Sequence, residues 1–226
     1  GRRSPDRTVS IETADAHARH GQFIHAVGVP RATALPSRSM KSQPTVVHGK
    51  IRLKHFDPGY CDGLDKDATR KLVEKYGRRI GELQELLYAN SGHAALLIFQ
   101  GMDASGKDGA IRCVLNHVNP SGVEVANFKV PSAEESAHDF LWRVHHAVPR
   151  FGNIGVFNRS HYEAVLAERV LELVPRQVWS RRYAQIVDWE RMLAENRVVL
   201  LKFYLHISRE EQAERIDEAR QRAFQE

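Results

Sequence analysis

The chain has 226 residues, 42% of them hydrophobic, which is enough to bury one substantial core with an appended piece. The formal net charge is +5, but residues 1–45 hold seven Lys and Arg against three acids and so carry +4 of it. The rest of the chain is nearly neutral, which argues against a general nucleic-acid-binding surface. With two cysteines, no apolar run as long as a membrane span and no apolar signal-peptide core, we expect a cytoplasmic protein without a nucleic-acid or membrane partner.

The chain divides at about residue 45. Residues 1–45 are rich in Ser, Pro, Thr, Arg and His without sustained periodicity, and they are predicted to form a mobile arm. Next, apolar residues recur every three or four positions, which predicts an amphipathic helix that ends at residues 91–92. Its apolar stripe is Leu64, Ala68, Leu72, Tyr76, Ile80, Leu83 and Leu87. The apolar run 94–100 then predicts a buried strand.

A glycine-rich turn follows this strand and leads into an apolar helix at 110–115. The turn, Gly101-Met-Asp-Ala-Ser-Gly-Lys-Asp-Gly109, matches Gly-x-x-x-x-Gly-Lys, the Walker A loop that cradles phosphates between a strand and a helix. Its glycines let backbone N–H groups approach an anion, the helix N-terminus adds positive potential, and Lys107 adds a full charge. We therefore predict that the chain binds a polyphosphorylated ligand.

The loop departs from the usual pattern at position 108, which carries Asp in place of a Ser or Thr whose hydroxyl normally binds Mg²⁺. Mg²⁺ is commonly held by one or two carboxylates together with substrate phosphates. We expect Asp103, inside the loop, to be the metal ligand. Asp108 is open to a second interpretation, because an acidic residue in the first turn of a helix also stabilises the helix dipole.

Strands and helices alternate through the rest of the chain. The predicted strands are 123–127, 154–157 and 198–207. The predicted helices are 132–147, which starts at a Ser132–Glu135 capping box, then 161–173, 177–195 and a last charged helix capped by Ser208 with Glu211. This alternation predicts the α/β class, with parallel βαβ units in a three-layer P-loop domain and the loop at the carboxyl end of its strand, where ligands of such sheets bind.

A second polar segment, Phe157-Asn-Arg-Ser-His-Tyr-Glu163, directly follows the strand at 154–157. Asn158 would lie near the metal, and Arg159 suits bidentate recognition of a phosphoryl group on which charge develops. Glu163 could add a carboxylate one helical turn further on. The alternative is structural: Asn158 and Ser160 would cap the helix at 161, and Arg159 would pair with Glu163 on the surface.

The two motifs together resemble the polyphosphate kinase 2 family, most closely its nucleotide phosphotransferases that use inorganic polyphosphate. The similarity covers about residues 50–216 and extends through 119–120, 128–132, 138–143 and 206–212. It implies a P-loop kinase-like fold with a mostly parallel sheet. It also implies an Mg²⁺-dependent transfer of a terminal phosphate between polyphosphate and a nucleoside mono- or diphosphate. We also expect a homo-oligomer.

The resemblance also assigns roles to residues of this chain. It implies that Asp103, Lys107 and Arg159 are catalytic and that Asn158, Arg159 and Glu163 form the second motif, although other subgroups have Asp in place of Asn158. The expected phosphate-binding residues are Gly101, Ala104, Ser105, Gly106, Lys107, Asp108, Gly109, Lys129 and Arg215. Asp103 is the expected metal ligand.

The resemblance further predicts a phosphotransferase domain over residues 46–226. Within it, 209–226 would be the start of a helical lid that continues further in the family, so a C-terminally truncated member with an incomplete lid is expected. Two other functions stay open at this point. One is a small-molecule kinase that uses ATP, and the other is an inactive polyanion-binding fragment.

Overall fold

The computed structural model describes residues 52–61 and 63–223, so the arm predicted for residues 1–45 lies outside the described residues. The chain divides into two units, Gly1–Asp65 and Lys66–Glu226. The described part of the first unit contains a single 3₁₀ turn, η1 (Leu53–His55), which is closed by a 2.9 Å hydrogen bond from the Phe56 N–H to the Leu53 carbonyl. Within the described residues no helix combines the length and apolarity needed to cross a membrane.

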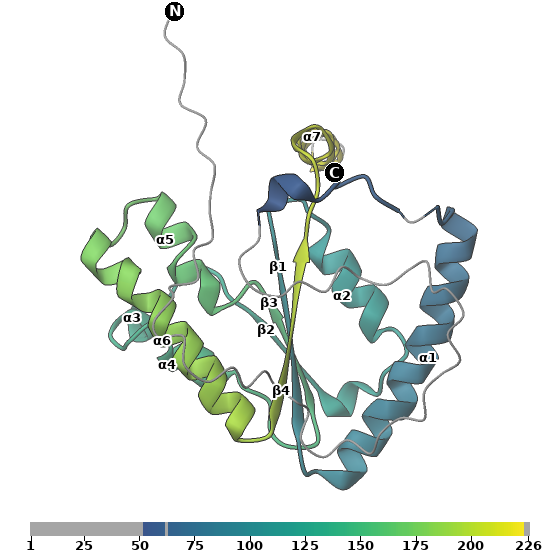
Figure 1. Cartoon of the computed structure of the whole chain (residues 1–226), viewed down its shortest axis with the longest axis horizontal. Helices are drawn as coiled ribbons and strands as arrows, with labels where there is room; N and C mark the ends of the chain where they lie inside the picture. The colour runs from purple at the N-terminus through teal and green to yellow at the C-terminus, as the bar shows by residue number, and fades with distance from the viewer. Residues whose placement is uncertain (1–51, 62, 224–226) are drawn as a thin grey trace, which may run out of the picture. The chain divides into compact units, whose positions relative to one another are not determined.

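The described part of the second unit is built on a four-stranded parallel sheet (Figure 1). Its strands are β1 (Ala94–Gly101), β2 (Val123–Asn127), β3 (Ile154–Asn158) and β4 (Val198–Leu205), in the order β2-β3-β1-β4. In the centre, Leu97 of β1 is in register with Val156 of β3 and Leu201 of β4. Because all four strands run in the same direction, their carboxyl ends lie along one edge of the sheet.

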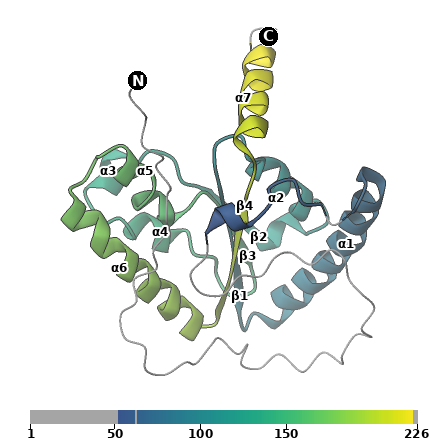
Figure 2. The ribbon, with the colours of Figure 1, turned by 45° about the horizontal axis from the view of Figure 1, so that its top comes forward.

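Helices cover both faces of this sheet, so the predicted three layers are confirmed (Figures 1 and 2). On one side lie α1 (Lys66–Asn90) and α2 (Lys107–Leu115), and on the other lie α3 (Ala133–Ser136), α4 (Trp142–His146), α5 (Ala167–Val170) and α6 (Arg176–Glu195). Short 3₁₀ turns, η2 (Pro120–Gly122) and η3 (His161–Ala164), precede β2 and follow β3. A last helix, α7 (Arg209–Ala223), lies beyond the carboxyl end of β4.

Each face of the sheet has its own hydrophobic core, because successive side chains of a strand point to opposite faces. Leu96 and Ile98 of β1 pack with Trp189 of α6 in one core. Leu97 and Phe99 of the same strand pack with α2 in the other. The strand that carries the glycine-rich loop is therefore buried on both sides, which gives that loop a rigid base.

Two of the predicted helices are broken in the structure. The capping box of Ser132 and Glu135 is present, but the helix it starts ends at Ser136, and a second helix begins only at Trp142. Between them the Asp139 carboxylate accepts a 2.9 Å hydrogen bond from the Leu141 N–H, a local contact that competes with helical pairing. The helix predicted at 161–173 is likewise two short pieces, η3 and α5.

The prediction for α1 was right about the helix and partly wrong about its buried face. Tyr76 and Leu83 of the predicted stripe are exposed, whereas Gly77 is buried. The helix approaches the end of α2 through its glycines: a Cβ on Gly77 would lie 2.2 Å from Cδ2 of His117, and one on Gly81 would lie 2.3 Å from the His117 carbonyl oxygen. Contact by close backbone approach leaves no periodic apolar signal in the sequence.

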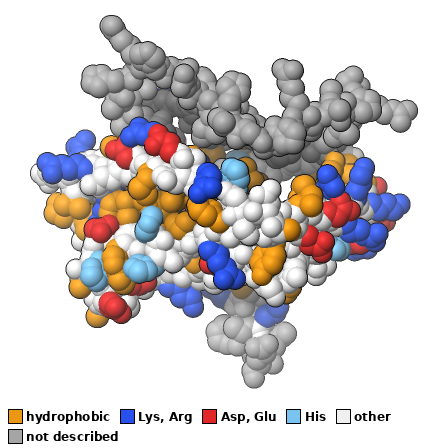
Figure 3. All heavy atoms as spheres, turned by 90° about the horizontal axis from the view of Figure 1, so that it is seen from below, with side chains coloured by type: hydrophobic (Ala, Val, Ile, Leu, Met, Phe, Trp, Pro, Cys, Tyr) orange, Lys and Arg blue, Asp and Glu red, His pale blue; other side chains and the backbone are white. Residues whose placement is uncertain are grey.

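The surface opposite the carboxyl edge of the sheet carries mixed charges. In Figure 3, basic and acidic side chains lie side by side over the end of the face that α1 occupies. Within α1, Arg78 pairs with Glu74 at 2.7 Å and Arg79 pairs with Glu82 at 2.6 Å. These pairs neutralise two of the basic side chains of this helix.

Candidate functional site

The glycine-rich loop has the backbone that its sequence predicts. β1 ends at Gly101, and α2 begins at Lys107 after Gly106, whose φ of +89° lies in the left-handed region that favours glycine. Ala104 also has a positive φ, +59°, although it carries a Cβ. The turn is closed by a 3.1 Å hydrogen bond from the Ser105 N–H to the Met102 carbonyl. The first N–H groups of α2 have no partner within the helix, so this end of α2 can receive an anion.

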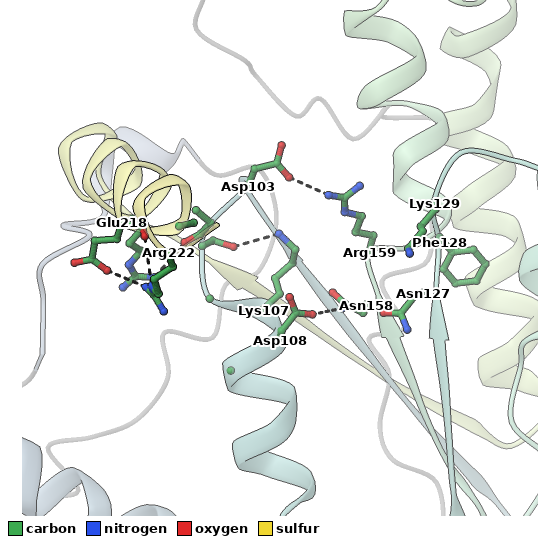
Figure 4. A pocket seen from close by; sticks show the side chains of 16 residues that line it. Asp103, Lys107, Asp108, Asn127, Phe128, Lys129, Asn158, Arg159, Glu218 and Arg222 are labelled. Carbon is green, nitrogen blue, oxygen red and sulfur yellow. Dashed lines mark hydrogen bonds and ion pairs between the residues drawn. The ribbon is translucent and has the colours of Figure 1, made fainter. Parts of the chain in front are cut away.

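Lys107 folds back across its own loop (Figure 4). Its ammonium group donates hydrogen bonds to the carbonyls of Gly101 at 3.0 Å and Met102 at 2.9 Å, and it lies 3.4 Å from the Ser105 hydroxyl. Burial lowers the pKa of Lys107, and the nearby Arg159 lowers it further, while the surrounding carboxylates oppose the change. A phosphate brought to this ammonium would replace weak carbonyl partners with a charged one.

The second motif lies directly opposite the loop, because β3 is the neighbour of β1. Arg159 donates its backbone N–H to the Phe99 carbonyl at 3.1 Å, and its guanidinium contacts the Asp103 carboxylate at 3.0 Å. Beside it, the Asn158 amide donates to Asp108 at 2.5 Å. Two side-chain contacts, which span 56 and 50 residues of sequence, therefore join the two motifs.

The structural alternative for this motif holds for one of its residues. The Ser160 hydroxyl caps η3 by accepting a 3.2 Å hydrogen bond from the Tyr162 N–H. Asn158 instead contacts Asp108, and Arg159 forms its ion pair with Asp103. Glu163 is half-buried, and burial raises the pKa of its carboxyl against the opposing influence of Arg159.

These groups border a cavity of about 970 Å³ at the carboxyl edge of the sheet (Figure 4). It is lined by loop residues 103–109, by residues 127–129 and 158–159 at the strand ends, and by Arg215, Glu218, Ala219 and Arg222 of α7. Of the nine residues expected to bind phosphate, all but Gly101 line it. Gly101 forms the floor of the turn, where a Cβ would lie 2.6 Å from the Ser105 hydroxyl.

The cavity contains residues that the sequence did not single out. Asn127 ends β2 in register with Asn158, so it reaches the same edge of the sheet. Arg222 lies seven residues, about two helical turns, after Arg215 on α7. The sequence held a signal for each of them. Asn127 ends a predicted strand of the parallel sheet, and Arg222 lies on the same face of the last helix as Arg215.

The last helix is fastened to the loop by main-chain contacts. Gln212 donates its side-chain amide to the Asp103 carbonyl at 2.9 Å. Arg215 donates to the Ala104 carbonyl at 3.3 Å and pairs with Glu211 at 2.6 Å. These contacts bring the basic face of α7 over the phosphate-binding loop.

The charge balance of the lining favours an anionic ligand. Its cations are Lys107, Lys129, Arg159, Arg215 and Arg222, and its carboxylates are Asp103, Asp108 and Glu218. The Asp103 side chain is 78% exposed, so it can meet a hydrated cation from solvent. Among the described residues, no three His, Cys, Asp or Glu side chains converge to form a metal cage. The donor set thus suits a cation held jointly by a carboxylate and by ligand oxygens, as Mg²⁺ commonly is.

Comparison with known proteins identifies relatives of this arrangement. The model of the family described as polyphosphate kinase 2 (PPK2) matches residues 63–226. An AMP/ADP-polyphosphate phosphotransferase of Meiothermus ruber is 50% identical over 181 residues, 79% of this chain and 68% of that protein. An ADP-polyphosphate phosphotransferase of Rhodopseudomonas palustris is 47% identical over 192 residues, 74% of this chain and 66% of that protein.

A solved structure points to the same family as these relatives. The crystal structure of polyphosphate kinase 2 from Arthrobacter aurescens superposes with a TM-score of 0.73 at 38% identity, covering 76% of this chain and 63% of that one. This likeness confirms the predicted P-loop kinase-like fold. The chain thus spans about two thirds of the length of the relatives named here.

Proposed function

The chain belongs to the polyphosphate kinase 2 family, and we propose that its site transfers a terminal phosphoryl group between inorganic polyphosphate and a nucleoside mono- or diphosphate. The observation that carries this proposal is the convergence of two motifs on one cavity. Lys107 comes from the loop, Arg159 comes from the neighbouring strand end, and the Asp103 carboxylate joins the two segments. An anion-binding loop alone would not need the second motif.

The transfer breaks the bond between the terminal phosphorus of polyphosphate and its bridging oxygen, and it forms a bond to a terminal phosphate oxygen of the nucleotide. The leaving group is polyphosphate shortened by one unit, and the reverse reaction lengthens it. Phosphoryl transfer needs positioning and charge neutralisation more than covalent help. An acceptor phosphate is already anionic near neutral pH, so the site needs no strong base.

The residues of the cavity divide this work between them. Lys107 and the N–H groups at the start of α2 hold the transferring phosphate, and Lys107 exchanges its loop carbonyls for phosphate oxygens. Arg159 stabilises charge that spreads over the phosphoryl oxygens in the transition state. Arg215 and Arg222 of α7 contact the chain of phosphates from the opposite side.

We also propose that Mg²⁺ takes part and that Asp103 would hold it, with Asp108 next to it in the lining. When bound, the ion would supply positive charge between neighbouring phosphates. The exposure of Asp103 supports this assignment. The Asp108 carboxylate accepts a hydrogen bond from the Asn158 amide, and this contact holds the carboxylate beside the N-terminus of α2.

Self-association is a further part of the proposal. Large apolar side chains are exposed at the end of α5 and just beyond it, among them Val170, Leu171 and Leu173. Exposed apolar groups of this kind are often covered by another protein surface. Light scattering on a size-exclusion column would give the mass of the particle, and a monomer at micromolar concentration would contradict a homo-oligomer.

The test of the function is an assay with polyphosphate as donor and AMP, ADP or GDP as acceptor, in the presence of Mg²⁺. AMP and ADP are the acceptors in the names of the two relatives described above. GDP is added because a GDP-polyphosphate phosphotransferase of Pseudomonas aeruginosa is 31% identical to this chain over 153 residues. We expect nucleotide phosphorylation by the wild-type protein and a loss of about 100-fold or more in kcat for Lys107→Ala. Lys71→Ala is the matched control, because Lys71 is an exposed lysine on α1 outside the site.

Two other results would overturn the assignment. Phosphorylation that requires ATP and refuses polyphosphate as donor would identify a small-molecule kinase. Salt-sensitive binding of polyphosphate without turnover, in the chain and in a version extended to the full length of its relatives, would identify a polyanion-binding module. An unchanged rate in Lys107→Ala would also reject the proposed role of the loop.

A further inference from the structure

A polar cluster that is largely buried, with Lys202 half-exposed at its edge, lies behind the second motif and outside the cavity lining. It joins His161 and Tyr162 of η3, Glu190 of α6 and Lys202 of β4. One Glu190 oxygen contacts Nε2 of His161 at 3.1 Å and accepts the Tyr162 hydroxyl at 2.7 Å. The other accepts the Lys202 ammonium at 2.7 Å. Three elements are thus tied together at a single carboxylate, and η3 contributes residues that lie 28 and 29 positions before Glu190.

The protonation states within this cluster follow from burial and from charge. Burial alone would raise the pKa of Glu190, but hydrogen bonding from His161 and the charge of Lys202 outweigh it and lower that pKa to about 2. Burial lowers the pKa of His161, so the imidazole is neutral at neutral pH. The neutral ring donates through Nε2 to Glu190, which leaves Nδ1 as a buried nitrogen without a partner in the described part of the chain. Glu190 is therefore a charged anchor that receives three donors.

Glu190 holds a backbone segment whose conformation is strained at Arg159. Arg159 has a φ of +63°, a left-handed conformation that costs a residue with a side chain on the order of 1 kcal/mol or more. Such a conformation persists only when its surroundings fix it. On its N-terminal side, β3 pairs with β1 as far as Asn158. On its C-terminal side the fixed points are Ser160, which accepts a 2.8 Å hydrogen bond from Gln100, and the His161–Tyr162 pair held by Glu190.

We propose that Glu190 is a positioning residue for phosphoryl transfer. By fixing His161 and Tyr162, it keeps Arg159 in the strained conformation that points its guanidinium at Asp103 and into the cavity. This inference rests on the proposed function, because it assigns Arg159 a task on the transferring phosphate. Glu190 itself touches neither the cavity nor the loop among the described residues, so its effect on the reaction must pass through the segment at 158–162.

Substitution Glu190→Gln tests the inference, since glutamine keeps the shape of the side chain and removes its charge. We expect kcat to fall about 10- to 100-fold while the KM for nucleotide changes less than about threefold, because a displaced Arg159 weakens transition-state contacts. The control is Asp188→Asn, an exposed carboxylate on the same helix that pairs with Arg191 and should leave kcat unchanged. Tyr162→Phe is the second variant, for the case that Glu190→Gln does not fold. It removes the hydroxyl that donates to Glu190 and accepts from Lys202, and we expect a milder loss of kcat in the same direction.

A double-mutant cycle separates positioning from a merely structural role. If Glu190 acts through Arg159, then adding Glu190→Gln to Arg159→Ala should reduce kcat by less than about threefold beyond Arg159→Ala alone. Losses that multiply, or a wild-type kcat in Glu190→Gln, would overturn the proposal.

A measurement without turnover distinguishes this inference from the proposed function. Hydrogen exchange of the amides of residues 159–163 should be faster in Glu190→Gln than in wild type or Asp188→Asn, while exchange in β1 is unchanged. Equal exchange in all three proteins would contradict the anchor. If exchange is faster in Glu190→Gln but the wild-type protein transfers no phosphate, then the role of Glu190 in fixing the backbone is supported and only the proposed reaction is refuted.

Discussion

At the scale of single residues, Lys107 and Glu190 show two ways in which a charged group with little exposure to solvent is stabilised by hydrogen bonds. The Lys107 ammonium is satisfied by carbonyls of its own loop, and these are neutral partners that a phosphate can displace. The Glu190 carboxylate is satisfied by three donors from two other elements, η3 and β4, which hold it in place. The first arrangement prepares a group for binding, and the second fixes a backbone.

The charge of Glu190 makes the stability of the fold depend on pH. A carboxylate with a folded-state pKa of about 2, below the ordinary value of 4.5, favours the folded state at pH above 4.5. This contribution, on the order of 3 kcal/mol, is lost as the pH falls from about 4.5 toward 2. The lowered pKa of His161 acts in the same direction, because acid protonates the unfolded imidazole first.

Urea unfolding at a series of pH values would measure this effect. We expect the difference in unfolding free energy between wild type and Glu190→Gln to be largest near pH 6 and to shrink as the pH approaches 3. A difference that stays constant over that range would show that folding does not lower the pKa of Glu190.

Spacing along the chain was enough to single out the residues to which we assign the proposed reaction. Asp103, Lys107 and Arg159 follow strand ends, and a strand end can be read from its apolar run. Glu190 could not be found in this way, because its partner His161 is 29 residues away and only the packing of α6 joins the two.

At the scale of elements, the interface of α1 with the end of α2 depends on missing side chains. Gly77→Ala would place a Cβ 2.2 Å from His117, and we expect this overpacking to lower the free energy of unfolding by about 1–3 kcal/mol. Gly109→Ala is the matched comparison, because a Cβ at that helical position meets no atom of residues 52–61 or 63–223 within 4 Å. There alanine should leave stability unchanged or raise it by up to about 1 kcal/mol.

Thermal or urea denaturation of the two variants would compare these positions. An equal effect of both substitutions would mean that helix propensity, and not the close approach to His117, determines the cost. The same interface explains why the sequence misled about the buried face of α1. Its periodic apolar residues include Tyr76 and Leu83, which are exposed, whereas the actual contact is made by glycines that carry no hydrophobic signal.

Strands and caps were more predictable than helix lengths. The strand at 123–127 and the cap at Ser132 depend on a few adjacent residues, and both are as predicted. The break near Asp139 and the two pieces at η3 and α5 depend on side-chain contacts and on packing against α6, for which a period of three to four residues gives no sign.

At the scale of the whole cavity, five cations face three carboxylates, so affinity for a polyanion should depend on salt. We expect Arg222→Ala to raise the KM for polyphosphate several-fold at low salt, because one of these charges is lost. Raising the ionic strength should then weaken binding by this variant less steeply than by wild type. Arg220→Ala is the control, since Arg220 lies on the same helix, is exposed and pairs with Asp217.

Initial rates over a range of polyphosphate concentrations, at several salt concentrations, would give the KM for polyphosphate and its salt dependence for the three proteins. Equal salt dependence in wild type and both variants would mean that Arg222 does not contact the polyanion. The basic character of α7 could be read from the sequence, but its placement over the loop follows from Gln212 and Arg215, whose partners are main-chain carbonyls more than 100 residues earlier.

The order of the strands also has a consequence for how this protein is made. β1 is in the middle of the sheet, but its neighbour β3 is synthesised about 60 residues later and its other neighbour β4 about 100 residues later. A nascent chain emerging from the ribosome therefore carries its phosphate loop for many seconds without the strands that support it, at elongation rates on the order of 5–20 residues per second. The apolar run at 94–100 is exposed during that interval, which makes it the stretch where a chaperone would be expected to act.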